Sequence, residues 1–109
     1  MFLIVTKYLI PKGYHGLAFF PFVFVKQPLD KQNTVFVNHE RIHLRQQLEL
    51  LIIPFFIWYF LEFCLRWIQY KNFDLGYRNI SFEREAYAKE KDLDYLKRRS
   101  FWEFLKYIR

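Results

Sequence analysis

The sequence predicts a small α+β domain, in which an N-terminal β-hairpin or sheet packs on three main helices and a short C-terminal helix follows. The length of 109 residues allows one hydrophobic core, so residues 1–109 are expected to form a single domain. The first 26 residues are rich in β-branched and aromatic types, and helical spacing of apolar residues begins near residue 34. With 53% hydrophobic and 23% aromatic residues, the chain does not have the composition of a disordered tail.

Residues 1–26 predict a β ribbon. Strand-forming residues run over 2–10, and after a turn a second run covers 17–26. Pro21 interrupts the second run, and because proline has no backbone N–H to donate, that strand is expected at a sheet edge or with a bulge. A polar loop then leads to the helical part of the chain.

Helical spacing indicates four helices, over residues 34–53, 54–70, 81–99 and 100–109. Pro54 is expected to separate the first two helices or to occupy the first turn of the second. Residues 71–80 are interpreted as a connection. Ser81 can cap the third helix with its hydroxyl, and Ser100 with Glu103 has the capping-box spacing that opens the last.

The helix over residues 54–70 lies in an apolar stretch. The twelve uncharged residues between Glu49 and Glu62 fall short of the roughly 20 that span a bilayer. Extending the stretch to Tyr70 adds Glu62 and Arg66, whose charges are costly in lipid. A buried central helix is therefore the first interpretation, and an interfacial or re-entrant membrane segment is the alternative.

Charge and cysteine content limit which partners and which cellular locations are expected. The formal net charge of +6 permits contact with an anionic membrane surface, but the basic residues are scattered and form no nucleic-acid reading motif, so no nucleic acid is predicted. The single cysteine, Cys64, excludes an internal disulfide, and the N-terminus does not resemble a signal peptide. We expect a cytoplasmic location with possible membrane association, and the oligomeric state stays open.

The pattern H-E-x-x-H occurs at residues 39–43. Because residues four apart lie on the same face of a helix, His39 and His43 can present two imidazoles to one ion, at the ligand spacing of a catalytic zinc site. Glu40 then lies where its carboxylate can take a proton from water. The sequence thus predicts a Zn²⁺ cofactor; the alternative is that both histidines are ordinary helix residues.

A catalytic zinc site needs a third protein ligand. Glu83 and Glu85 are acidic candidates on the third predicted helix, and since positions two apart point about 200° away from each other, only one can face the metal. His15 is the remaining histidine, in a predicted turn, and is a weaker candidate for ligand or electrophile. Tyr77 and Tyr87 can support the site or steady an oxyanion.

The order of H-E-x-x-H, apolar helix and Glu83-Arg84-Glu85-Ala86 resembles the gluzincin metallopeptidases. It is similar both to minimal soluble gluzincins and to membrane-associated zincins with an HExxH…ExxA pattern. The resemblance covers residues 34–99 by motif and order. Two positions depart from the pattern: Tyr87 stands where the family usually has an aspartate, and Leu48 where membrane members commonly have an acidic residue.

The resemblance implies a zinc-dependent peptidase that acts on peptide or protein substrates, and the small size of the chain is compatible with a latent form. The roles that it implies are metal ligands His39, His43 and Glu83, a fallback third ligand Glu85, and the general base Glu40. Substrate is expected to add as a strand along residues 17–25, and the small chain leaves little room for deep specificity pockets. A non-catalytic metal-binding or membrane-surface protein on the same scaffold is the alternative.

Overall fold

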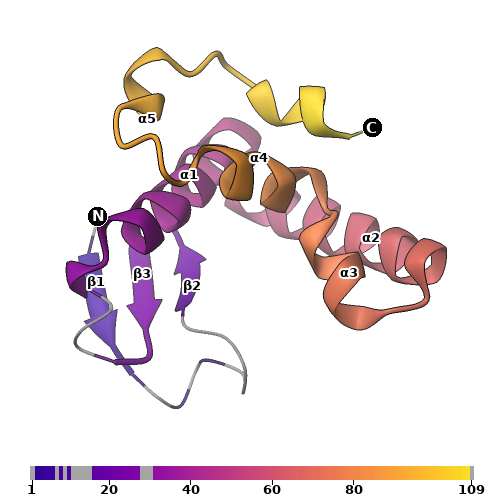
Figure 1. The fold of residues 1–109 in the computed structure, drawn as a ribbon, viewed down its shortest axis with the longest axis horizontal. Coiled ribbons are helices and arrows are strands. Elements are labelled where there is room, and N and C mark those ends of the chain that lie inside the picture. Colours follow the sequence, from indigo (N-terminus) through magenta and orange to yellow (C-terminus); the bar gives the residue numbers. More distant parts are fainter. Residues whose placement is uncertain (1, 7, 9, 11–15, 28–30, 109) are drawn as a thin grey trace.

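The computed structural model describes residues 2–6, 8, 10, 16–27 and 31–108 (Figure 1). A three-stranded sheet at the N-terminal end is followed by a helical body, which confirms the predicted α+β class. The elements in chain order are β1 (Phe2–Val5), β2 (Gly16–Phe19), β3 (Phe22–Val25), α1 (Thr34–Leu50), α2 (Ile52–Tyr70), α3 (Phe73–Arg78), α4 (Ser81–Lys89), α5 (Tyr95–Arg98) and the 3-10 helix η2 (Glu103–Tyr107).

The sheet has the order β1-β3-β2, with the central β3 parallel to β1 and antiparallel to β2. The prediction of one strand over residues 17–26 is wrong, because those residues form the β2–β3 hairpin. Pro21, joined to Phe20 by a cis peptide bond, lies in the turn of this hairpin, where its missing N–H removes no ladder hydrogen bond. The strand order places β2 at one edge of the sheet.

Helix α1 begins where the side chain of Asn33 accepts the backbone N–H of Phe36 at 3.1 Å. It ends before Leu51, whose backbone has a φ of 63°. Helix α2 starts directly afterwards, so Pro54 occupies its first turn, where a proline lacks no helical partner. The break between the two helices therefore lies at Leu51 and not at Pro54.

Residues 71–80, expected to be a connection, contain the short helix α3. Gly76 of α3 crosses α2 so closely that a Cβ atom there would lie 2.8 Å from the Cα of Trp67. The close approach holds α3 against the end of α2 and sets the direction in which the chain enters α4.

The predicted helix over residues 81–99 is two helices, α4 and α5, and the predicted C-terminal helix is the 3-10 helix η2. The chain leaves α4 in a turn held by Asn38 of α1. Its side-chain NH₂ donates to the carbonyls of Lys89, Glu90 and Asp92 at 3.3, 2.9 and 2.9 Å. These contacts satisfy carbonyls at and just beyond the end of α4, so the chain turns there toward α5.

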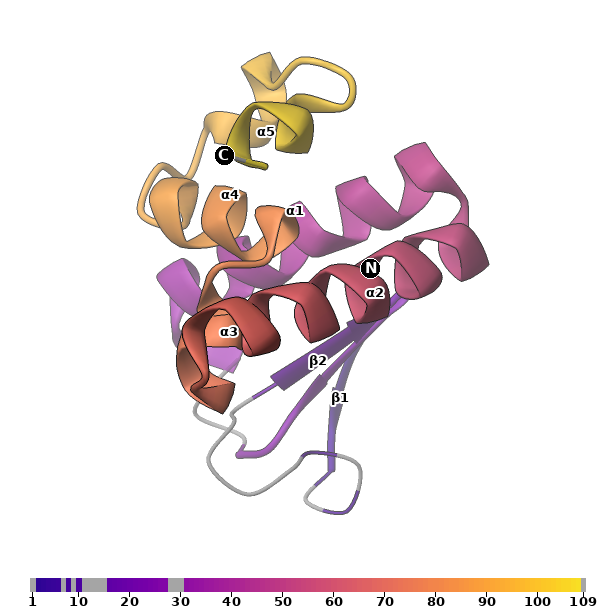
Figure 2. The ribbon, with the colours of Figure 1, turned by 90° about the vertical axis from the view of Figure 1, so that its right-hand side faces the viewer.

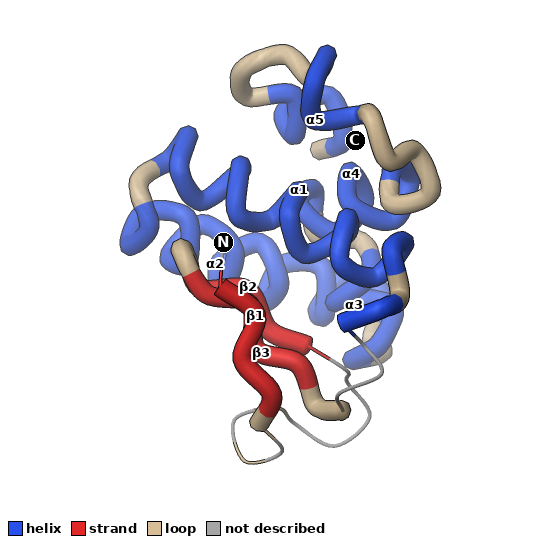
Figure 3. Tube along the Cα trace, turned by 90° about the vertical axis from the view of Figure 1, so that its left-hand side faces the viewer, coloured by secondary structure: helices blue, strands red, loops and turns tan. Residues whose placement is uncertain are grey.

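Helix α1 occupies the centre of the domain. On one side Leu44 packs on the sheet with Ala18, Val23 and Val25, and on the other Ile42 packs with residues of α4 and α5. Figure 3 shows the sheet and the C-terminal segments on opposite sides of this helix. The polar residues of α1 are therefore enclosed and need partners within the protein.

Helix α2 is the most exposed of the long elements, and the interpretation of a buried central helix is wrong. Only Phe55 and Glu62 of α2 are buried. Figure 2 shows α2 along one face of the molecule, with α1 behind it and the sheet below. The helix is long and apolar enough to cross a membrane by length and composition.

Candidate metal centre

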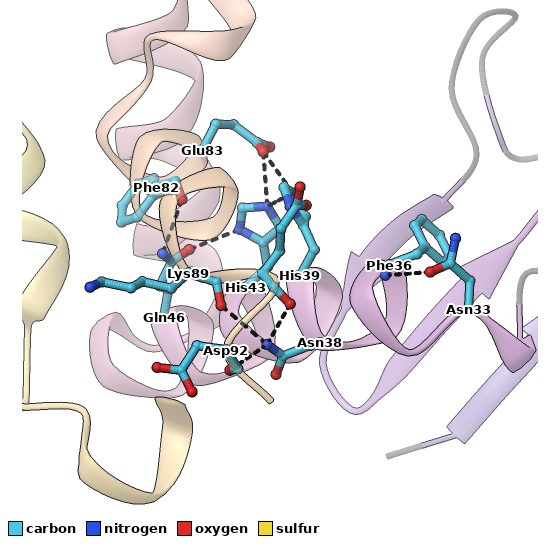
Figure 4. A network of polar contacts seen from close by, with 11 residues as sticks. Asn33, Phe36, Asn38, His39, His43, Gln46, Phe82, Glu83, Lys89 and Asp92 are labelled. Carbon is cyan, nitrogen blue, oxygen red and sulfur yellow. Dashed lines mark hydrogen bonds and ion pairs between the residues drawn. The ribbon is translucent and has the colours of Figure 1, made fainter. Parts of the chain in front are cut away.

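Three side chains from α1 and α4 converge in the interior (Figure 4). The Nε2 atoms of His39 and His43, one helical turn apart on α1, lie 3.2 Å from each other. The Oε1 atom of Glu83 lies 3.1 Å from each of these nitrogens. All three residues are at most 5% exposed, and the group can hold a metal ion.

Glu83 reaches this point because the start of α4 is anchored to α2. The carboxylate of Glu62 accepts the backbone N–H and the hydroxyl of Ser81 at 2.6 and 2.7 Å. Ser81 is thus the first residue of α4 and donates to α2, whereas the sequence predicts it as the residue that caps the helix. Phe82 packs on Phe55 with ring centroids 4.5 Å apart, and the next residue, Glu83, is turned toward α1.

The hydrogen bonds of Gln46 determine which nitrogen of His43 carries a proton. The NH₂ group of Gln46 faces two acceptors, the carbonyl of Phe82 at 3.1 Å and the carboxylate of Glu85 at 2.9 Å. Its amide oxygen therefore faces the Nδ1 atom of His43, at 2.9 Å. An acceptor at that position requires an Nδ1–H donor, so Nε2 of His43 presents its lone pair to Glu83.

The same reasoning applies to His39. Its Nδ1 atom lies 2.8 Å from a carboxylate oxygen of Glu90, which can only accept, so the proton is on Nδ1 and the lone pair is on Nε2. Two imidazole lone pairs and one carboxylate oxygen of Glu83 then meet at 3.1–3.2 Å. Three acceptors this close repel one another unless a cation lies between them.

The separations fit a tetrahedral metal. Bonds of about 2.0–2.1 Å to nitrogen and oxygen place ligand atoms of a tetrahedral site about 3.3 Å apart. In the metal-free chain a proton is the competing cation. Burial alone would lower the pKa of His43, but the carboxylate of Glu83 outweighs this and raises that pKa to about 9.

The charge of Glu83 is maintained by its partners. Burial favours the neutral acid, but His43 and His39 outweigh it and hold the pKa of Glu83 far below its usual range. The second oxygen of Glu83 accepts the hydroxyl of Tyr59 on α2 at 2.6 Å. One carboxylate oxygen is therefore anchored by Tyr59, and the other is free to serve as a ligand.

Glu85, the fallback third ligand, points away from the two histidines. Its carboxylate accepts the hydroxyl of Tyr95 at 2.7 Å and both Nε and Nη2 of Arg99, the latter at 3.0 Å. Arg99 also donates to Glu49 at 2.6 Å. Glu85 thus acts on the site through Gln46, whose orientation it helps to set.

Glu40 follows His39 on α1, is 7% exposed and lines a cavity beside the three converging residues. Burial raises the pKa of this carboxyl above its usual range. Among the described residues it takes part in no hydrogen bond, so the carboxylate is available to a molecule in the cavity.

The cavity has a volume of about 310 Å³. Its walls are mostly aromatic and come from α2 and α3, with the edge strand β2 on one side. The lining residues away from the polar cluster are Gly16, Leu17, Ala18, Phe55, Phe56, Tyr59, Phe63, Phe73 and Tyr77. Such a cavity suits a large apolar group.

The three secondary candidates have different positions. Tyr77 lines the cavity and donates its hydroxyl to Tyr87, and burial raises the pKa of Tyr77 far above its usual value, so it stays a donor. The ring of Tyr87 meets His39 edge to face at 4.6 Å. His15 lies outside the described residues.

Four residues of this site were not predicted from the sequence: Tyr59, Glu62, Glu90 and Arg99. Glu90 had a usable signal, because it follows Glu83 by seven residues and so falls on the same side of a helix. Glu62 also had one, as an isolated carboxylate in an apolar helix. Tyr59 and Arg99 carry no local signal, since their contacts depend on tertiary packing.

Comparison of the chain with protein-family models, with curated proteins and with solved structures found no match. Functional assignment therefore depends on the chemistry of the converging residues and of the cavity beside them.

Proposed function

We propose that this chain is a zinc-dependent metallopeptidase of the gluzincin type. The observation that supports it most is the convergence of three lone pairs, from His39, His43 and Glu83, at the edge of a cavity that contains Glu40. Two imidazole nitrogens and one carboxylate oxygen in a tetrahedral arrangement are the ligand set of many catalytic zinc sites. The cavity leaves a side of the site open to a substrate.

A metal bound there would lower the pKa of a water and polarise a carbonyl oxygen. Glu40 takes the proton of the attacking water and returns it to the nitrogen of the leaving amine, a cycle favoured by its raised pKa. Tyr77, which stays protonated and lines the same cavity, would turn its hydroxyl from Tyr87 to the oxygen on which negative charge develops. Glu90 and Gln46 keep the two imidazoles in the tautomer that leaves Nε2 free.

The proposed substrate is a peptide with a large apolar side chain next to the scissile bond. The aromatic cavity takes that side chain, and the peptide backbone pairs with the edge strand β2. The amide of Gln47 already bonds the carbonyl of Ala18 and the N–H of Phe20, at 2.8 and 2.6 Å. Pairing is therefore expected at Gly16, which lines the cavity.

The test combines metal analysis with peptide cleavage. Purified protein should bind one zinc ion per chain and cleave peptides that carry Phe or Leu more readily than the same peptides with Asp. The Glu40→Gln chain should keep the metal and lose cleavage, whereas His43→Ala should lose both. A chain that neither contains nor takes up a divalent metal contradicts the proposal.

The deep burial of the ligands also supports a second function, a metal that serves structure alone. A structural site stabilises the fold when metal is added, but the loaded protein cleaves no peptide. Glu40→Gln would then leave every measured property unchanged, since no proton transfer depends on it.

A further inference from the structure

A continuous apolar stripe runs along the outer face of α2. Its residues are each at least 57% exposed, and their spacing of three and four positions puts them on one side of the helix. They are Ile53, Ile57, Phe60, Leu61, Leu65 and Ile68. At 1.5 Å per residue the stripe is about 22 Å long. Single exposed apolar residues are common on soluble proteins, but a continuous stripe of this length is not.

Both charges of α2 are turned away from this stripe. Glu62 accepts the backbone N–H and hydroxyl of Ser81, and its side chain is 8% exposed. Arg66 donates to the carbonyl of Ile108 and, at 2.8 Å, to the side chain of Gln69. Both charged groups are thus directed at partners within the protein, which lowers the cost that they would have beside lipid.

The apolar surface continues onto the sheet. Phe19 of the edge strand is 48% exposed and stacks on Phe56 of α2 at 5.3 Å. Phe19 and Phe56 line a shallow groove together with Ile53, Ile57, Phe60 and Leu61. Two elements far apart in sequence thus share one apolar face.

We propose that this face lies in the lipid of a membrane, with α2 parallel to the bilayer plane. Among the exposed residues between Ile53 and Ile68, polar atoms are limited to the indole N–H groups of Trp58 and Trp67. A protein interface usually makes about one hydrogen bond per 100–200 Å², whereas hydrocarbon makes none, so the stripe suits lipid. The net charge of +6 complements the anionic surface of a membrane.

The parallel orientation follows from what covers the other side of α2. Phe55 packs on Phe82, and Trp67 packs on Phe73, so the inner side of the helix is covered by its own chain along its length. A spanning α2 would carry α1 and its buried polar residues into hydrocarbon. A helix that lies in the interface buries only one side, by about 5–10 Å.

The experiment is flotation of the full chain with vesicles of phosphatidylcholine and phosphatidylglycerol, without metal or substrate. Failure of this test is therefore separate from failure of the peptidase proposal. The chain should float with the vesicles. For the double variant Ile57→Glu/Leu61→Glu, the ratio of vesicle-bound to free protein should be at least about tenfold lower. The matched control, Leu93→Glu/Phe101→Glu, changes two exposed apolar residues elsewhere and should float like the unchanged chain.

Each remaining outcome overturns the proposal. If the control loses flotation as much as the stripe variant, the stripe is not the lipid contact. If the unchanged chain stays in the soluble fraction as a dimer and the stripe variant is a monomer, a second copy covers α2. Circular dichroism confirms that each variant is folded.

A depth measurement tests the orientation. In a Cys64→Ser background, spin labels on Ile53→Cys, Phe60→Cys and Ile68→Cys should all report the same depth in the bilayer. A helix that spans the membrane places the middle label deepest, and that result would overturn the parallel orientation.

Discussion

Helices α1 and α2 follow each other in the chain and distribute polar and apolar residues in opposite ways. Six of the eight buried residues of α1 are polar: Asn38, His39, Glu40, His43, Gln46 and Gln47. In α2 the exposed residues include no charged one, and six large aliphatic or aromatic side chains form its outer stripe. Each helix is the reverse of the ordinary surface helix of a soluble domain.

The difference is what we expect if each helix has a partner outside the chain. Buried polar groups are tolerated only when they are paired, and the pairing around α1 leaves three lone pairs aimed at one point, which calls for a cation. Exposed apolar area is tolerated best when another apolar surface covers it, and for α2 we propose that this surface is lipid. The helix that carries the polar site and the helix that carries the apolar stripe are separated in the chain by a single residue, Leu51.

The largest expected effect is on the buried ion pairs that Arg99 makes with Glu85 and Glu49. Arg99→Met leaves the carboxylates of Glu85 and Glu49 buried without their cation, since the Arg99 side chain is 0% exposed. The free energy of unfolding should fall by about 3–5 kcal/mol in urea titrations at pH 7. Arg98→Met is the control: Arg98 pairs with Asp92 at the surface, and its loss should cost less than about 1 kcal/mol. Equal losses for the two variants would show that the buried network is not what holds α1.

The second effect tests Glu83 as the third metal ligand. Glu83→Gln replaces a carboxylate ligand by a neutral amide, so zinc affinity should fall by about a hundredfold or more in competition with a chromophoric chelator. Glu103→Gln, a glutamate outside the site that pairs with Lys106, should leave the affinity unchanged. Unchanged affinity in Glu83→Gln would mean that Glu83 is not a ligand.

Local geometry explains which parts of the site the sequence predicts. His39 and His43 are four residues apart on one helix, so their side chains point the same way whatever the rest of the fold is. Glu83 and Glu85 could not be told apart, because the choice depends on how α4 is rotated, and Glu62 and Arg99 set that rotation through tertiary contacts.

The same limit explains the errors in the fold. Hydropathy along residues 54–70 averages over all sides of the helix, so it could not separate a buried helix from one with an exposed stripe. The break between α4 and α5 depends on Asn38, which is more than fifty residues away in sequence. The turn at Pro21 is a local feature, and its composition was compatible with both a bulge and a hairpin.

The third effect is the competition between proton and metal at His43. The pKa of this residue rises from 6.5 to about 9 in the metal-free fold, so the proton stabilises that fold below pH 6.5 and the gain is lost as the pH rises through 9. Zinc affinity should move the other way, rising about tenfold per pH unit across this window. Chelator competition at pH 7 and pH 8 measures the slope. A flat profile would show that no proton leaves the site when metal binds.

The smallest effect concerns one substitution on each helix. Exchanging a polar residue for an apolar one usually stabilises a protein interior, and the reverse exchange usually destabilises it. Here we expect the opposite order of costs. On α1, Gln47→Met leaves the carbonyl of Ala18 and the N–H of Phe20 without their partner, and should cost about 1–3 kcal/mol despite the added apolar surface. On α2, Leu61→Gln removes an apolar side chain that touches solvent, and should change the free energy of unfolding in lipid-free solution by less than about 0.5 kcal/mol. Urea titration of both variants gives the comparison. If Leu61→Gln costs as much as Gln47→Met, the outer face of α2 is packed against protein in solution, and the lipid contact loses its basis.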